Sequence, residues 1–116
     1  MIEVKFIKIE TGSSLADVQD ENKILLFYFI NDYHAPYKLP RVIDDLKQVA
    51  SGEKTFDDIQ DPDGDWSFGN DSGTFECDKD TAYFRSERPD TEPSMEMPLQ
   101  ELIDILERWK DFLGIK

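Results

Sequence analysis

Two amphipathic segments constrain the fold of this chain most strongly. Residues 39–51 and 98–113 repeat apolar side chains at the spacing of three and four residues that gives a helix one buried face. Proline stands at the start of each segment and glycine directly after its end: Pro40 and Gly52, Pro98 and Gly114. That asymmetry is typical of helix boundaries. The sequence therefore predicts two helices, each of which needs an apolar surface to cover.

Short apolar runs between turn residues predict strands that supply this surface. Residues 23–30 are apolar on both faces, which favours a central strand covered on both sides. The other predicted strands are residues 2–9, 66–68, 73–78 and 81–87, with a short extended piece over 94–97. The polar segment 11–22 fits either a loop or a short helical turn capped by Ser13 or Ser14.

The order of these elements predicts an α+β fold. Strands that follow one another closely favour antiparallel pairing, with the helices segregated from them. We expect one domain over residues 1–116, a mostly antiparallel sheet of about five strands, and the helices 39–51 and 98–113 packed on it.

Cysteine content and the N-terminal residues bear on the compartment. Cys77 is the single cysteine, so no disulfide can form within the chain, which fits a reducing compartment. The first ten residues lack the pattern of a signal peptide. The longest apolar run, residues 24–30, is far shorter than the ~18 residues that span a bilayer. We expect a cytoplasmic protein.

Acidity is the feature that bears most directly on function. The chain has 26 Asp and Glu against 13 Lys and Arg, a net charge of −13. Residues 57–80 alone hold nine acidic residues and one lysine, a net charge of −8. Such a field repels nucleic acid and anionic membranes and steers basic proteins inward. We therefore expect a basic protein partner, and neither nucleic acid nor membrane.

The acidic stretch is the predicted contact surface. Trp66 lies among its carboxylates, and an aromatic anchor ringed by charge suits a protein interface. The alternative is that Trp66 and Phe68 face the core from an edge strand. Tyr33 and Tyr37, in the loop after the apolar run, form a second predicted patch. The predicted partner-binding residues are Asp57, Asp58, Asp61, Asp63, Asp65, Trp66, Asp71, Tyr33 and Tyr37.

Catalytic and metal-binding patterns are missing from the sequence. His34 is the one histidine, and no second group stands at a spacing that implies a catalytic pair. Residues 61–65 resemble the start of a calcium loop, but positions 6 and 12 hold Trp66 and Ser72 where glycine and glutamate are required. Cys77 stands between Glu76 and Asp78, and we interpret it as a small apolar side chain. We predict no enzyme activity, no metal and no cofactor, and the alternative is an enzyme that uses His34 with a carboxylate. Arg85 and Arg88 are expected to pair locally, with Glu87, Asp90 and Glu92.

The closing segments Met95-Glu96-Met97-Pro98-Leu99 and Glu107-Arg108-Trp109-Lys110-Asp111-Phe112-Leu113 resemble the last helix of several small bacterial protein families. In size, acidity and style the chain is similar to the immunity proteins of toxin–immunity systems, such as the contact-dependent-inhibition immunity proteins and barstar. The resemblance implies a cytoplasmic inhibitor that blocks a basic, nuclease-type toxin with carboxylates and aromatic side chains. The alternative is a structural or regulatory adaptor, or an oligomerisation domain that forms a homodimer and uses its acids for solubility alone.

Overall fold

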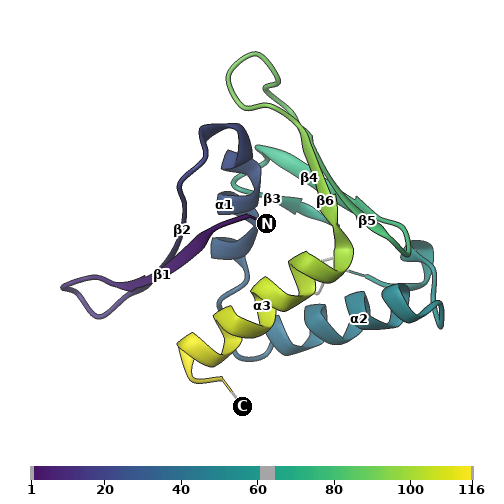
Figure 1. Ribbon diagram of the computed structural model, residues 1–116, viewed down its shortest axis with the longest axis horizontal. Helices are drawn as coiled ribbons and strands as arrows, with labels where there is room; N and C mark the ends of the chain where they lie inside the picture. Colours follow the sequence, from purple (N-terminus) through teal and green to yellow (C-terminus); the bar gives the residue numbers. More distant parts are fainter. Residues whose placement is uncertain (1, 61–64, 116) are drawn as a thin grey trace.

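A four-stranded antiparallel sheet built from residues 67–98 forms one side of the molecule (Figure 1). The computed structural model describes residues 2–60 and 65–115. The strands run in the order β3 (Ser67–Phe68), β4 (Gly73–Cys77), β5 (Thr81–Ser86) and β6 (Met95–Pro98), each paired with the next. All three predicted strands of this region and the extended piece after them are confirmed. One face of the sheet buries Phe68, Phe75, Ala82, Phe84 and Met97.

A separate two-stranded hairpin forms the N-terminus. Strand β1 (Val4–Lys8) pairs antiparallel with β2 (Ser14–Val18), so that Phe6 stands opposite Ala16. The strand predicted over residues 2–9 is confirmed. For residues 11–22 neither the loop nor the capped helical turn is right, because residues 14–18 form a strand. Ala16 and Val18 alternate toward the core beside Val4 and Phe6, which is the period of a strand.

Helix α1 (Ile24–Asp32) replaces the strand that the sequence predicted over residues 23–30. A short run that is apolar on every side fits a buried helix as well as a buried strand, because periodicity cannot separate the two. The structure places α1 between the two sheets, in contact with β2, β3 and β5. Its buried residues are Leu25, Leu26, Phe29 and Ile30.

The two amphipathic helices are confirmed. Helix α2 spans Leu39–Ser51 and α3 spans Leu99–Leu113, and the two pack against each other. Gly52 and Gly114 follow them with φ of 85° and 74°, a left-handed conformation that glycine adopts without a steric penalty. Pro98 ends β6 directly before α3 and does not occupy the first helical turn.

The described residues thus form an α+β fold with strands divided between two antiparallel sheets, instead of the predicted single sheet of about five strands. The single-turn helices η1 (Glu21–Lys23) and η2 (Phe56–Asp58) complete the elements.

Phe29 of α1 joins the helices to the larger sheet. Its ring is fully buried and lies 4.8 Å from the ring of Phe75 and 5.3 Å from that of Phe84, measured between centroids. On the helical side it lies 4.8 Å from Tyr33, whose carbonyl accepts a 3.0 Å hydrogen bond from Trp109 Nε1 of α3. Phe29 and Tyr33 together therefore link the larger sheet, α1 and α3.

Phe29→Ala is expected to lower the free energy of unfolding by about 3–5 kcal/mol, because it opens a cavity where the sheet and helices meet. Phe27→Ala is the matched control on the same helix, since Phe27 is half-buried at the margin of the core. Urea denaturation of both variants checks the prediction. Equal losses for the two would contradict the central position of Phe29.

Candidate functional site

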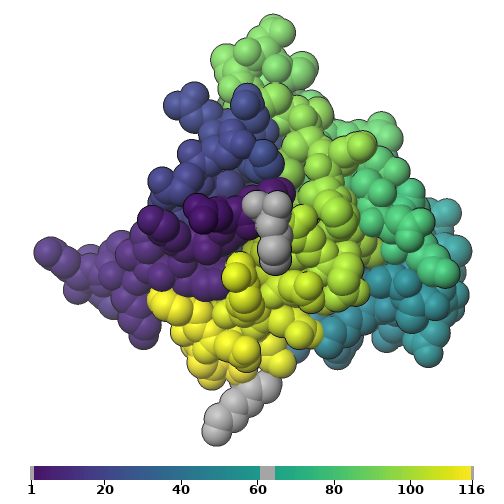
Figure 2. Space-filling model, in the orientation of Figure 1, coloured from purple at the N-terminus to yellow at the C-terminus, as the bar shows by residue number. Residues whose placement is uncertain are grey.

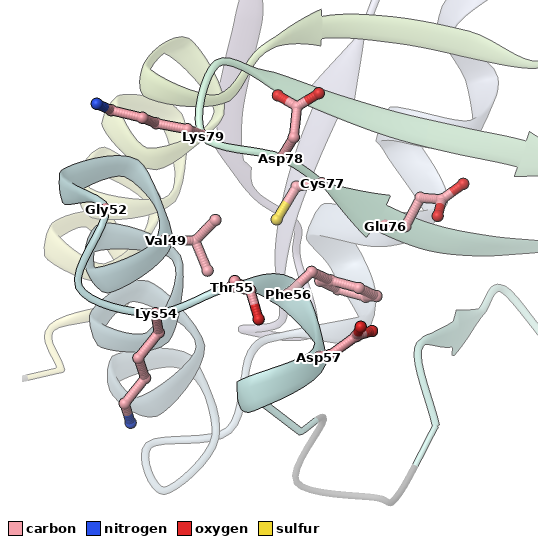
Figure 3. A pocket seen from close by; sticks show the side chains of 10 residues that line it. All are labelled: Val49, Gly52, Lys54, Thr55, Phe56, Asp57, Glu76, Cys77, Asp78 and Lys79. Atoms are coloured by element: carbon pink, nitrogen blue, oxygen red, sulfur yellow. The ribbon is translucent and has the colours of Figure 1, made fainter.

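A hollow of about 460 Å³ opens between the end of α2, the η2 turn and the turn that joins β4 to β5 (Figure 3). Val49, Phe56 and Cys77 line it with apolar groups, and Figure 3 shows the side chains of Val49 and Cys77 turned toward each other across it. Asp57, Glu76 and Asp78 also line the hollow, and Figure 3 shows the carboxylates of Glu76 and Asp78 directed away from the Cys77 thiol. The hollow thus has an apolar floor, and acidic residues lie in the segments around it.

A cluster of three aromatic rings, packed at tilted and edge-on angles, supports the floor of the hollow. The ring centroid of Phe56 lies 5.6 Å from that of Trp66 and 6.1 Å from that of Phe75. Trp66 in turn lies 5.4 Å from Phe75. Trp66 is half-buried, so it both packs on the core and leaves part of its ring at the surface. Phe68 is buried, as the alternative reading of this segment expected.

Asp78 is held in place by the turn that it closes. Its carboxylate accepts hydrogen bonds from the backbone N–H of Asp80 and of Thr81, both at 2.8 Å, and from the hydroxyl of Tyr83 at 3.0 Å. These bonds, those from the Asp80 and Thr81 amides first, lower the pKa of Asp78 and keep it charged. A fixed, charged group therefore stands at this side of the hollow.

Lys54 and Lys79 also border the hollow, but Figure 3 shows their ammonium groups pointing away from the Cys77 thiol. Glu76 forms an ion pair with Arg85 on the neighbouring strand, so Arg85 pairs across the sheet and not with the predicted Glu87, Asp90 or Glu92. Asp57 is exposed, and the structure shows no hydrogen bond or ion pair to its carboxylate from any described residue. Asp57 is thus the acid at the margin with the most freedom to meet a partner.

The predicted contact acids divide into two kinds. Asp58 accepts hydrogen bonds from the backbone N–H and the hydroxyl of Thr55, and Asp65 accepts them from Ser67. The bond from the Thr55 amide is the main cause that lowers the pKa of Asp58, and the bond from the Ser67 hydroxyl lowers that of Asp65. Both therefore cap local turns. The predictions for Asp61 and Asp63, and with them the calcium-like loop, fall on residues 61–64, outside the described residues.

Asp71 lies at the opposite end of β4 from the hollow, in the turn after β3. Gly69, Asn70 and Asp71 all have positive φ, at 63°, 55° and 65°. Aspartate and asparagine enter this region more easily than most residues, but three in succession need support. The predicted surface is therefore not one patch: the structure brings Asp57 near Trp66 through Phe56 and leaves Asp71 apart.

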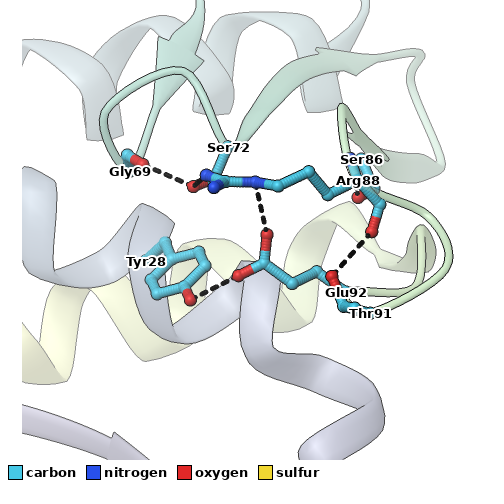
Figure 4. A network of polar contacts seen from close by, with 7 residues as sticks. All are labelled: Tyr28, Gly69, Ser72, Ser86, Arg88, Thr91 and Glu92. Atoms are coloured by element: carbon cyan, nitrogen blue, oxygen red, sulfur yellow. Dashed lines mark hydrogen bonds and ion pairs between the residues drawn. The ribbon is translucent and has the colours of Figure 1, made fainter.

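A polar network supports the turn that holds Asp71 (Figure 4). Ser72 Oγ donates to the Gly69 carbonyl at 2.5 Å and accepts from the Arg88 guanidinium at 2.7 Å. Arg88 Nε lies 3.2 Å from Glu92, and the Tyr28 hydroxyl donates to the other oxygen of that carboxylate at 2.5 Å. This hydrogen bond is the main cause that raises the pKa of Tyr28. Arg88 thus pairs locally, as predicted, and serves the architecture of the turn.

The second predicted patch is divided in the same way. Tyr33 is 3% exposed and packs on Phe29, which corrects the expectation that it offers a contact surface. The sequence placed Tyr33 in a loop after a strand, whereas it directly follows helix α1 and packs on the core. Tyr37 is 74% exposed and remains available. His34 is exposed, and its Nδ1 lies 3.0 Å from the Asn31 carbonyl.

Sequence reasoning did not find the hollow itself. Residues 49, 56 and 77 are far apart along the chain, and nothing in their spacing shows that α2, η2 and β4 converge. The available signal was the predicted turn at residues 78–80, which has acids on both sides of a lysine.

Across residues 2–60 and 65–115, no group of three or more His, Cys, Asp or Glu side chains is placed to hold a metal ion. In the same residues no helix is both long and apolar enough to cross a bilayer.

Comparison with known proteins adds no relative to this geometry. No protein family, curated protein or solved structure among those searched matches the chain.

Cys77 is expected to react slowly despite its place in the hollow. Burial, with the charges of Asp78 and Glu76, raises the pKa of its thiol from 9.0 to about 12. Because the thiolate is the nucleophile, alkylation by iodoacetamide near neutral pH should be about a thousandfold slower than for an ordinary cysteine. Mass spectrometry of the native protein measures the rate, and protein unfolded in guanidinium chloride is the control. Equal rates in the two states would show an exposed thiolate instead.

Proposed function

We propose that the chain is a non-enzymatic acidic protein that binds and neutralises a basic protein, in the manner of an immunity protein that inhibits a nuclease-type toxin. The hollow carries this proposal, because its apolar floor lies beside Asp57, whose carboxylate is exposed. Lysine and arginine side chains have the matching form, an apolar stem that ends in a charged head. A basic side chain of the partner would lay its stem on Phe56 and Val49 and bring its charge to Asp57.

The chemistry of nuclease toxins supports the choice of partner. Their clefts bind phosphate backbones and are therefore basic. An inhibitor of net charge −13 approaches such a cleft under attraction, which raises the association rate. Binding of this kind needs no catalytic group on the inhibitor.

Some of the predicted contact acids are bonded in local turns and others are not, and this difference indicates which residues would make the contact. Asp58 and Asp65 are engaged in local turns, so their charges contribute to the field more than to direct pairing. Asp57, the exposed part of Trp66 and Tyr37 retain free surface. We therefore assign the central contact to Asp57 and Trp66, with Tyr37 and Asp71 as separate outlying positions.

Asp57→Lys is expected to weaken binding of the basic partner by about tenfold or more at low salt, because an attractive pair becomes a repulsive one. Tagged protein captures the partner from lysate of the source organism, stepwise salt elution releases it, and titration of that partner then measures affinity. Asp44→Lys is the matched control, since Asp44 is exposed on α2 and makes the same change in net charge.

Two results separate this proposal from the alternative of an adaptor or oligomerisation domain. Equal losses in Asp57→Lys and Asp44→Lys would mean that net charge matters and the hollow does not. Recovery of the chain alone or as a homodimer, with no basic partner at low salt, would favour the adaptor or oligomerisation domain, in which the acids provide solubility.

A further inference from the structure

The β1–β2 hairpin covers the core with one face and turns its other face away from the core. Because side chains alternate along a strand, two cross-strand pairs stand on the second face: Lys5 with Asp17, and Ile7 with Leu15. Ile7 and Leu15 neither belong to the apolar core cluster of the described residues nor pack against it. These four residues form the outer hairpin face.

The outer hairpin face carries apolar side chains where contact with water would favour polar ones. Ile7 is 38% exposed, and Ile9, two residues further along the chain, is 46% exposed. Across residues 2–60 and 65–115, the other large apolar side chain that is exposed is Tyr37. The open face of an antiparallel sheet usually carries polar residues. Apolar side chains that gather on such a face indicate contact with another chain.

The rest of the molecule lies on the other side of the hairpin. Trp109 and Phe112 of α3 pack on the ring of Phe6, which stands on the core side of β1. Helix α1 contacts β2, whose buried residues Ala16 and Val18 stand on that same side. In Figures 1 and 2 the purple hairpin also reaches out from the body of the molecule. The outer hairpin face is therefore accessible to a partner.

The charges of this face select a second copy of the chain as the occupant. Lys5 and Asp17 lie at one level of the hairpin and Ile7 and Leu15 at the next level of the same face. If two hairpins stack face to face about a twofold axis parallel to their strands, β1 of each copy lies over β2 of the other. Ile7 then meets Leu15, and Lys5 meets Asp17, in both halves of the contact. A partner of one sign would instead repel one of the two charges.

Both charged groups are available for this contact. Lys5 is exposed, Asp17 is half-exposed, and neither forms an ion pair with a described residue. We propose that the outer hairpin face joins two copies of this chain in a twofold homodimer. This proposal does not depend on the function proposed for the hollow.

The dimer is expected to be weak and to strengthen with salt. Four side chains a copy fall far below the roughly 20–30 residues a side of a standard interface, so we expect a Kd of about 10–1000 µM. A net charge of −13 on each copy also opposes association. Salt screens this repulsion between all the charges of the two copies, which outweighs the loss from screening two ion pairs. Binding of a basic partner at the hollow weakens with salt, so the two proposals respond in opposite directions.

Sedimentation equilibrium of the whole chain tests the proposal, at protein concentrations up to about 1 mM and in about 0.05 and 0.5 M sodium chloride. Ile7→Thr should weaken dimerisation by about tenfold, because it removes apolar contact from both halves of the symmetric interface. Threonine suits a strand and Ile7 has no core contact, so the fold should be retained. Tyr37→Ser is the matched control, since it removes an exposed apolar side chain outside the hairpin and should leave dimerisation unchanged.

A charge exchange tests the register of the two copies. Lys5→Asp should weaken dimerisation by about fivefold, because it sets two carboxylates against each other in each half of the contact. The double variant Lys5→Asp, Asp17→Lys has the net charge of the original chain and should recover the affinity. Circular dichroism shows whether each variant is folded.

The proposal is overturned if the chain remains monomeric up to about 1 mM at both salt concentrations. It is also overturned if added salt dissociates the dimer, or if Tyr37→Ser weakens the dimer as much as Ile7→Thr does. Failure of the double variant to recover the affinity lost in Lys5→Asp would overturn the twofold arrangement and with it the proposal.

Discussion

The packing of Phe29 against aromatic rings of the larger sheet is the contact on which the rest of the structure depends. Helix α1 is covered on its sides by both sheets, and Phe29 brings it against Phe68, Phe75 and Phe84 at centroid distances of 5.6, 4.8 and 5.3 Å. The next residues of the helix then position the Tyr33 carbonyl for Trp109 of α3. With α1 so placed, α2 and α3 close the core together. Phe75 also supports Phe56 and Trp66, so the floor of the hollow rests on the same cluster.

The acidic residues have two physical roles that composition does not separate. Asp58, Asp65 and Asp78 accept backbone hydrogen bonds in turns, and those bonds lower their pKa values. They stabilise local structure and supply a long-range field at once. Asp57 has no such bond from the described residues and is the acid at the hollow that can pair with a partner at no cost to the fold.

Two polar side chains bond to backbone groups at strand edges. The Asn31 side chain of α1 accepts from the Ala16 N–H and donates to the Ala16 carbonyl, which fixes α1 against β2. The Asp65 carboxylate accepts from the Ser67 N–H at the start of β3. Polar residues of this acidic chain therefore stabilise the fold directly as well as contributing charge.

The sequence by itself determined the elements that bury one face and expose the other. Helices α2 and α3, the strands β4 and β5 and the turns between them follow from apolar spacing and from proline and glycine, because a half-buried element must show its period. It also determined the net charge and the local pairing of Arg88. Only the tertiary structure decided that residues 24–32 are helical, since an element buried on all sides shows no period. The tertiary structure also turned Tyr33 inward, divided the strands between two sheets and brought residues 49, 56 and 77 around one hollow. These arrangements depend on contacts between segments that are far apart along the chain. The sequence spacing of such segments carries no information about their distance in space.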